Sequence, residues 1–336
     1  MKVSGMLGAD LDMAPLAIAE LEQRGYNAAF SAEINSDPFF PLVLAAEHSN
    51  AIALTTSISV AFARNPMTMA NLAWDLNQYS KGRFTAGLGS QIKPHITRRF
   101  SMPWSKPAAR MREFILAMQA IWDCWETGKK LEFNGEFYQH NLMTPMFTPS
   151  QTTYGAPGVN LAAVGPLMTE AAAEVANGVI AHGFTTLQYL QQVTLPAVQR
   201  GLEKSGRTRE EFDISLPVMV VTGATKEAFE ASKAAVKGQL GFYASTPAYK
   251  PVLEVHGWGD LQTEANQLTR EGRWQEMGAL ITDDILNAFA LVSENIEQVP
   301  ALLNERYGGL VDTWMCTVET GDREQQQRLV ADVQKL

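Results

Sequence analysis

The sequence predicts an α/β protein with a (β/α)8 barrel, or TIM-barrel, fold in a single domain over residues 1–336. Eight short apolar segments alternate with segments of helical periodicity, which is typical of a parallel sheet whose strands are joined by helices. Eight successive strand–helix units close into a barrel. The glycines near the first strand form no Gly-x-Gly-x-x-Gly motif, so an open dinucleotide-binding sheet is disfavoured.

The first half of the chain contains four strand–helix units. Apolar strands begin near residues 2, 27, 52 and 83. The spacing of Ala14, Ala17, Ile18 and Leu21 at i, i+3, i+4 and i+7 predicts the first helix, and Gly25 ends it. Further helices are predicted over 38–50, 66–79 and 107–127.

Two segments interrupt or extend this alternation. After the fourth strand and its helix, residues 129–158 contain Asn134-Gly135 and several prolines, which predicts an insertion with a hairpin followed by an irregular loop. Residues 245–300, after the seventh helix, are predicted to add further helical segments. The remaining strands are predicted over 159–164, 178–182, 214–222 and 310–318, and the remaining helices over 166–176, 185–204, 226–243 and 323–335.

Composition and charge limit the class of protein. The net charge is −9, which argues against a nucleic-acid-binding protein, because such a protein usually carries a basic face. The N-terminus lacks the features of a secretory signal, and no run of about 18 apolar residues predicts a membrane span. We therefore expect a cytoplasmic protein with a small-molecule partner and no membrane partner. Cys124 and Cys316 are expected to be buried free thiols.

The end of the fourth strand carries the first candidate site residues, because parallel barrels bind ligands at the C-terminal ends of their strands. In Gly89-Ser90-Gln91, glycine lets the backbone approach a flat ring or a phosphate, and Ser90 offers a hydroxyl. The alternative is an ordinary tight turn. His95 and the two arginines that follow it form either a cationic edge for an anionic cofactor or a solvated loop.

Other strand ends carry candidates with open alternatives. Glu33, after the second strand, can orient a substrate or transfer a proton, or it can cap the following helix or pair with a cation. Val164-Gly165 opens a helix whose N-terminus can bind an anion, or it forms a simple turn. Ser57-Ile58 alone predicts a buried strand. No Cys or His spacing is typical of a metal site, so we expect none.

Several motifs, in the same order along nearly the whole chain, resemble one enzyme family. They are Thr56-Ser57-Ile58, Arg64-Asn65-Pro66, Tyr79-Ser80-Lys81-Gly82-Arg83-Phe84, Ala86-Gly87-Leu88-Gly89, Pro107 with Arg110 and Glu113, Phe133-Asn134-Gly135-Glu136-Phe137-Tyr138, Leu161-Ala162-Ala163-Val164-Gly165 and Ala176-Asn177-Gly178-Val179. With these motifs the chain resembles the bacterial luciferase-like monooxygenase superfamily. The branch that depends on the deazaflavin coenzyme F-420 is the closer likeness, carried by Gly89-Ser90-Gln91-Ile92-Lys93, His95, Arg98-Arg99 and Glu33 with Asp37-Pro38-Phe39.

This resemblance implies a barrel with an insertion after strand four and a site for F-420 or FMN at its C-terminal face. It implies a non-prolyl cis peptide at Ser57-Ile58 behind the cofactor ring, which Gly89, Ser90 and His95 would line together with Gln91. The cofactor tail would lie along Ala163, Val164 and Gly165.

The chain departs from the family pattern at the end of strand two. Many deazaflavin-dependent enzymes carry an Asp-His pair there, where this chain has Ala32-Glu33. Either Glu33 replaces the acid–base histidine, or the reaction needs no such group. Glu33 and His95 are therefore the predicted catalytic residues.

The function that the resemblance implies is an oxidoreductase that transfers a hydride between F-420 and a small organic substrate. One alternative is an FMN-dependent monooxygenase that uses oxygen and needs a separate reductase. A further alternative is a non-catalytic flavin-binding barrel. A cofactor-free hydrolase is disfavoured, because the sequence shows neither a metal motif nor a carboxylate pair at the strand ends. A homodimer is also a family expectation.

Overall fold

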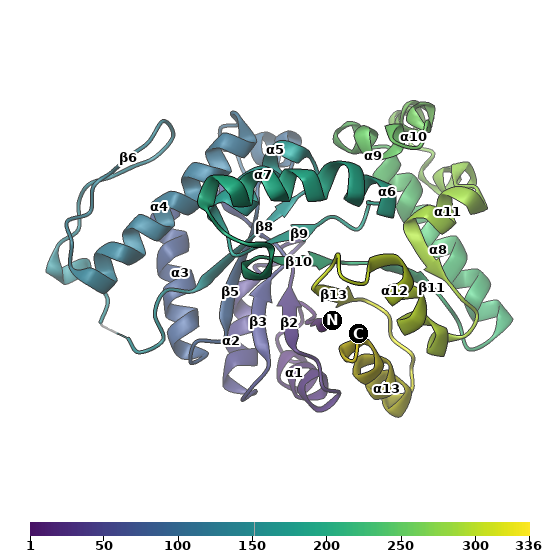
Figure 1. Ribbon diagram of the computed structural model, residues 1–336, viewed down its shortest axis with the longest axis horizontal. Helices are drawn as coiled ribbons and strands as arrows, with labels where there is room; N and C mark the ends of the chain where they lie inside the picture. Colours follow the sequence, from purple (N-terminus) through teal and green to yellow (C-terminus); the bar gives the residue numbers. More distant parts are fainter. Residues whose placement is uncertain (151) are drawn as a thin grey trace. The chain divides into compact units, whose positions relative to one another are not determined.

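The computed structural model describes residues 1–150 and 152–336, which form two compact units (Figure 1). The N-terminal unit comprises Ser4–Ile180 and Ala197–Asp213. The C-terminal unit comprises Met1–Val3, Ala181–Pro196 and Ile214–Leu336. That the chain is a single domain stays a prediction.

The eight predicted barrel strands are all present, and helices follow them in the order that the sequence predicted. The strands are β1 (Lys2–Met6), β2 (Ala28–Ser31), β3 (Ala53–Thr56), β5 (Phe84–Gly89), β8 (Gly158–Ala163), β9 (Gly178–Ala181), β10 (Asp213–Leu216) and β13 (Thr313–Cys316). The larger helices up to residue 205 are α1 (Ala14–Gln23), α2 (Phe39–Glu47), α3 (Pro66–Tyr79), α4 (Pro107–Thr127), α5 (Pro166–Val175) and α7 (Leu195–Ser205).

In the N-terminal unit the parallel strands follow the order β1-β2-β3-β5-β8-β9. Phe30 on β2 pairs with Thr55 on β3, and Thr55 pairs in turn with Thr85 on β5. A short extra strand, β4 (Ser59–Val60), pairs with the end of β5, where Val60 lies opposite Gly89. The ends of β2, β3 and β5 are thereby held together by backbone pairing.

Two helices of this unit have the bounds that the sequence predicted. Asn65 caps α3 by accepting a hydrogen bond from the backbone N–H of Thr68, and Pro66 occupies the first turn. Pro107 likewise stands at the start of α4, and Gly128 ends it in the left-handed conformation with φ 71°. Trp122 and Trp125 on α4 are 2% and 1% exposed, so they belong to the core.

The predicted hairpin in the insertion is present as β6 (Phe133–Asn134) and β7 (Gln139–His140), and Figure 1 shows it beside α4. Glu113 on α4 accepts hydrogen bonds from the backbone N–H groups of Glu136, Phe137 and Tyr138 at 2.6–2.8 Å. One carboxylate thus satisfies the three amides of the turn. Residue 151 of the insertion lies outside the described residues.

The C-terminal unit corrects two predictions. The strand predicted over 214–222 is two strands, β10 and β11 (Met219–Val221), separated by Pro217, which has no N–H to donate to a ladder. The segment predicted as helical over 245–300 also contains a strand, β12 (Ala290–Val292), which pairs in parallel with β11. Its tripeptide Ala-Leu-Val is too short for a helix or strand period to be recognised.

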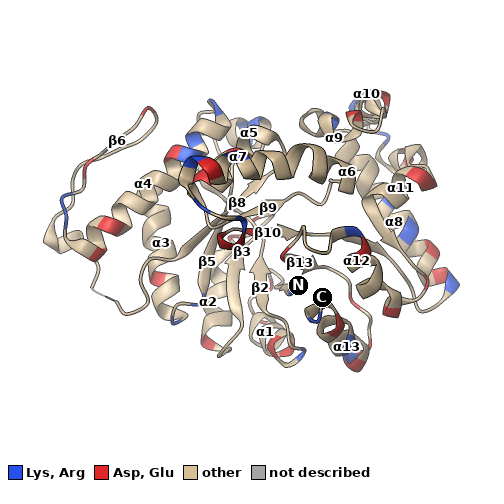
Figure 2. Ribbon diagram, in the orientation of Figure 1, with Lys and Arg blue, Asp and Glu red and all other residues tan. Residues whose placement is uncertain are grey.

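The other helices of the C-terminal unit lie in segments predicted as helical, except that the helix at Val299–Tyr307 extends beyond the segment predicted to end at residue 300. They are α6 (Leu187–Tyr189), α8 (Lys226–Ala244), α9 (Lys250–Glu254), α10 (Gly259–Arg270), α11 (Asp283–Phe289), α12 (Val299–Tyr307) and α13 (Arg323–Gln334). Figure 2 shows that charged residues lie mostly on helices and loops, as expected when strands form a core. Cys124 and Cys316 are free and buried, as predicted. None of the described helices is long and apolar enough to cross a membrane.

Candidate functional site

The bond between Ser57 and Ile58, at the end of β3, is a non-prolyl cis peptide, which confirms the expectation drawn from the resemblance. The N–H of Ser57 donates to the carbonyl of Ser31 at 2.7 Å, and the carbonyl of Ile58 accepts from the N–H of Glu33 at 3.1 Å. Both residues of the cis bond are therefore anchored to the end of β2.

A side-chain hydroxyl anchors the same loop to β5. Thr56 is fully buried, and its Oγ1 donates to the carbonyl of Gly87 at 2.7 Å and accepts from the N–H of Gly87 at 2.9 Å. A Cβ at Gly87 would lie 1.7 Å from the carbonyl oxygen of Thr56, so this crossing requires glycine. Sequence reasoning recognised both residues as motif members but missed this role, which only the three-dimensional pairing reveals.

Gly89 and Ile58 are in direct contact. A Cβ at Gly89 would lie 2.8 Å from Cδ1 of Ile58, so glycine lets the Ile58 side chain pack against the end of β5. The structure thus brings together three of the residues predicted to hold the cofactor ring, namely Ser57, Ile58 and Gly89.

Glu33 is part of a buried ion pair. Its Oε2 accepts from Nη1 of Arg64 at 2.6 Å and from the backbone N–H of Val60 at 2.8 Å, and its side chain is 8% exposed. Arg64 also donates to Oδ2 of Asp37 at 2.8 Å. These contacts favour a positioning role for Glu33 over proton transfer, and sequence reasoning missed Arg64 as its partner.

The loop after β5 continues the candidate site. Gln91 adopts a positive φ of 58°, and the hydroxyl of Ser90 donates to the carbonyl of Gln91 at 3.1 Å. His95 begins a π-helical turn, and its side chain is exposed. At the other end of the turn, Arg99 donates to the carbonyl of Ile34 at 2.6 Å, which ties this loop to the loop after β2. Lys93, His95 and Arg98 are exposed along this segment.

The residues predicted to hold the cofactor tail connect the end of β8 to α5. Ala163 is the last residue of β8, and Val164 connects it to Gly165, the N-cap of α5. A Cβ at Gly165 would meet no atom within 4 Å, so there is open space at this helix N-terminus. Amides at a helix N-terminus favour anions, so Gly165 and its neighbours fit a phosphate-bearing cofactor.

The C-terminal unit holds a group of aromatic side chains around His182, which directly follows β9. Its Nδ1 accepts from the backbone N–H of Phe184 at 3.0 Å, and its Nε2 lies 3.3 Å from the hydroxyl of Tyr249. The His182 ring centroid is 4.8 Å from that of Tyr243 and 4.6 Å from that of Tyr249. Burial lowers the pKa of His182 from 6.5 to about 4 and raises the pKa of Tyr249 to about 12.

The lowered pKa of His182 makes a prediction about acid stability. The folded state takes up a proton at His182 only near pH 4, whereas the unfolded chain does so near pH 6.5, so acid favours unfolding within this window. Between pH 7 and pH 5 we expect the wild type to lose about 2 kcal/mol more unfolding free energy than His182→Gln. Urea unfolding at both pH values measures this. His95→Gln, at an exposed imidazole, should behave as the wild type, and an equal pH response in all three proteins would contradict the prediction.

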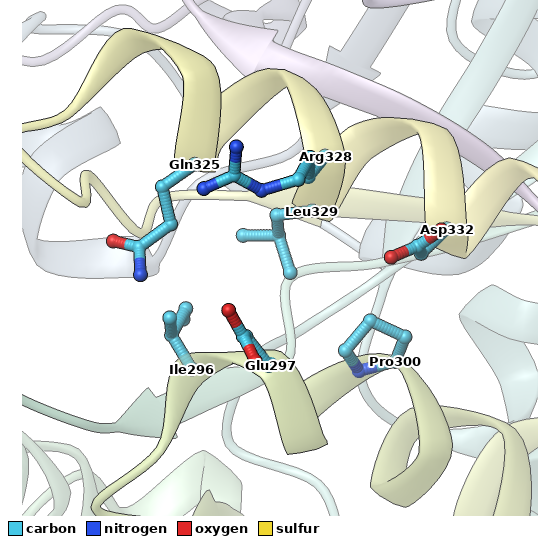
Figure 3. A pocket seen from close by; sticks show the side chains of 7 residues that line it. All are labelled: Ile296, Glu297, Pro300, Gln325, Arg328, Leu329 and Asp332. Carbon is cyan, nitrogen blue, oxygen red and sulfur yellow. The ribbon is translucent and has the colours of Figure 1, made fainter.

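A separate hollow of about 400 Å³ lies between α12 and α13 (Figure 3). Apolar Ile296, Pro300 and Leu329 lie beside charged Glu297 and Arg328 in its lining. None of these residues stands at the end of a barrel strand, and this hollow has the composition of an ordinary groove between two helices. In residues 1–150 and 152–336, no group of three or more His, Cys, Asp or Glu side chains is arranged to hold a metal ion.

Comparison with known sequences places this chain in a protein family. The model of the luciferase-like monooxygenase family matches residues 5–313. An uncharacterized protein of Mycobacterium tuberculosis is 50% identical over 312 residues, which cover 93% of this chain and 92% of that protein. The 5,10-methylenetetrahydromethanopterin reductase of Archaeoglobus fulgidus is 25% identical over 277 residues, covering 81% of this chain and 78% of the reductase.

Solved structures support the fold. The coenzyme F420 dependent tetrahydromethanopterin reductase of Methanopyrus kandleri matches with a TM-score of 0.76 and 21% identity, covering 98% of this chain and 96% of the reductase. The oxygenating constituent of 3,6-diketocamphane monooxygenase from Pseudomonas putida, in complex with FMN, matches with a TM-score of 0.67 and 15% identity, covering 100% and 97%. These likenesses confirm the (β/α)8 barrel fold. The extent of the family match shows that the chain belongs to the luciferase-like monooxygenase family.

Proposed function

We propose that this protein transfers a hydride between the deazaflavin coenzyme F-420 and a small organic substrate. The observation that carries the proposal is the cis Ser57-Ile58 loop, packed against Gly89 and anchored to β2 and β5. Such a loop is a preorganised surface for a flat ring. Relatives named as F420-dependent, among them a putative oxidoreductase of M. tuberculosis at 25% identity, support this choice of cofactor.

We assign the cofactor contacts as follows. Ser57, Ile58 and Gly89 would support the ring, together with Ser90 and Gln91, and the open helix N-terminus after Ala163-Val164-Gly165 would hold the tail. The cofactor supplies the carbon that accepts or donates the hydride, and the protein orients it and excludes water.

The two predicted catalytic residues receive different roles in this proposal. His95, exposed at the start of its π-helical turn, belongs to the cationic edge with Lys93 and Arg98 and remains a candidate for contact with cofactor or substrate. Glu33 is assigned to positioning, because Arg64 and the amide of Val60 occupy its Oε2. This assignment follows the reading in which the reaction needs no acid–base group at the end of strand two.

The second candidate function is an FMN-dependent monooxygenase that receives reduced FMN from a separate reductase. The family description and the FMN complex of the Pseudomonas enzyme favour it. Reduced FMN reacts with oxygen, whereas a deazaflavin does not readily, so the cofactor decides the reaction class. A non-catalytic flavin-binding barrel is the remaining alternative function. We also propose that the protein is cytoplasmic and forms a homodimer.

The test is a titration of the purified protein with F-420 and, separately, with FMN, followed by absorbance and fluorescence. We expect F-420 to bind at least tenfold more tightly than FMN. Preference for FMN would replace the proposal with the monooxygenase, and binding of neither would overturn both. Bound F-420 that no substrate panel can oxidise or reduce would support the non-catalytic alternative.

A matched pair of variants tests the position of the cofactor tail. Gly165→Asp places a negative charge in the open space at the α5 N-terminus, so it should weaken F-420 binding by about tenfold. Gly238→Asp adds the same charge on α8, where a Cβ also meets no atom within 4 Å. Equal affinity in both variants would contradict the assignment of the tail to Gly165.

A further inference from the structure

The contacts of His182 fix which of its nitrogens carries the proton. The backbone N–H of Phe184 donates to Nδ1, so Nδ1 carries no hydrogen. A neutral imidazole has one N–H, which must then be on Nε2. An imidazolium would place a second hydrogen on Nδ1, directly facing the N–H of Phe184. The ring is therefore a neutral Nε2–H tautomer.

This tautomer fixes the direction of the hydrogen bond to Tyr249. The Nε2–H of His182 donates to the phenolic oxygen, 3.3 Å away. The hydroxyl proton of Tyr249 is thus directed elsewhere, and no acceptor for it occurs among the residues that the structure describes. Because burial raises the pKa of Tyr249 to about 12, the hydroxyl keeps this proton at neutral pH.

The ring of Tyr249 lies among other aromatic rings. The ring of Phe184 stacks on those of Tyr249 and Phe289 at centroid distances of 5.8 Å and 4.5 Å. Tyr243 is the other tyrosine of the group, and its hydroxyl already accepts from Nε2 of Gln239 at 3.1 Å. The group therefore offers apolar ring surface and, held by its central histidine, the hydroxyl of Tyr249 as a donor. Moreover, its central histidine directly follows a barrel strand, which is where barrel enzymes bind substrates.

We propose that the Tyr249 hydroxyl is the hydrogen-bond donor to an oxygen of the substrate, and that His182 is the residue that positions it. The substrate class that fits is a flat or apolar carbonyl compound with a single acceptor oxygen. This inference rests on the proposed oxidoreductase function, because it names the substrate group that Tyr249 would bind there. It assigns no proton transfer to Tyr249.

The first experiment measures how the full chain, without cofactor, binds a carbonyl compound and shifts its carbonyl stretching frequency. Acetophenone labelled with ¹³C at the carbonyl is compared with ethylbenzene, which lacks the oxygen, for the wild type, Tyr249→Phe and Tyr243→Phe. We expect the wild type to prefer acetophenone and to lower its carbonyl stretching frequency. Tyr249→Phe should lose about fivefold in acetophenone affinity together with the frequency shift, whereas Tyr243→Phe should retain both.

The alternative outcomes overturn the proposal. Equal losses in the two phenylalanine variants would contradict a specific role for the Tyr249 hydroxyl, and no loss in either would mean that the group acts only by packing. A wild type that binds acetophenone no better than ethylbenzene would exclude the acceptor class. Both phenylalanine variants keep the aromatic ring, so folding is preserved. Since no deazaflavin is present, failure here is distinct from failure of the F-420 titration.

The second experiment tests the positioning role of His182, first without any ligand and then by acetophenone binding. Imidazole ¹⁵N chemical shifts of labelled protein, assigned with His182→Gln, should report a neutral ring with its hydrogen on Nε2 at pH 7. His182→Gln should also weaken acetophenone binding in the same proportion as Tyr249→Phe. The double variant His182→Gln/Tyr249→Phe should lose no more affinity than either single variant. A ring with hydrogen on Nδ1, or additive losses in the double variant, would contradict the role.

Discussion

Gly87→Ala is expected to prevent the N-terminal unit from folding, the largest stability effect that we predict. The new Cβ would lie 1.7 Å from the carbonyl oxygen and 2.9 Å from the carbonyl carbon of Thr56, and both are backbone atoms. The strands cannot move apart without breaking the two hydrogen bonds between Thr56 Oγ1 and Gly87. We expect a loss above about 4 kcal/mol, in the range of strong backbone disruptions.

The measurement is the soluble yield and the urea midpoint of Gly87→Ala beside a matched control. Gly238→Ala, in the interior of α8, adds the same methyl group where a Cβ meets no atom within 4 Å. Alanine has the higher helix propensity, so this control should be unchanged or up to about 1 kcal/mol more stable. A folded Gly87→Ala with a urea midpoint close to the wild type would contradict the contact between β3 and β5.

Local patterns predicted those parts of the fold that local forces determine. Asn65-Pro66 and Pro107 with Gly128 predicted the bounds of α3 and α4, because caps and terminal residues act within one turn. Asn134-Gly135 predicted the hairpin for the same reason. By contrast, the pairing of β11 with β12 joins residues about 70 apart, and neither strand carries a period long enough to be read from the sequence.

In the candidate site, too, some features could be predicted from local sequence and others depend on residues far apart in the chain. The positions of Gly89 and Gly165 at strand ends could be read from the alternation of strands and helices, and the cis bond at Ser57-Ile58 followed from the family resemblance. The role of Glu33 could not be read from the sequence, because it depends on Arg64, which lies 31 residues away along the chain. A carboxylate at a strand end has the same local pattern whether it meets a substrate or a buried guanidinium.

Glu33→Ala is expected to destabilise the protein by about 3 kcal/mol and to weaken F-420 binding by tenfold or more. The substitution leaves the 15%-exposed Arg64 side chain with Asp37 as its one carboxylate partner among the described residues, and it removes the acceptor for the Val60 amide. The loop that carries the cis bond would then lose one of its anchors. Arg64→Met should have a similar effect, because it leaves the Glu33 carboxylate buried without its cation.

A double variant at Glu33 and Arg64 distinguishes ion pairing from catalysis as the role of Glu33. If the carboxylate acts by pairing, Glu33→Leu/Arg64→Met should recover part of the lost unfolding free energy, because removing both buried charges costs less than removing one. A catalytic carboxylate predicts a different pattern, in which Glu33→Gln keeps stability and F-420 affinity but abolishes turnover. Glu324→Ala, at an exposed pair with Arg328, is the control and should change stability by less than about 0.5 kcal/mol. A double variant no more stable than either single variant would argue against the ion pair as the reason for Glu33 at this position.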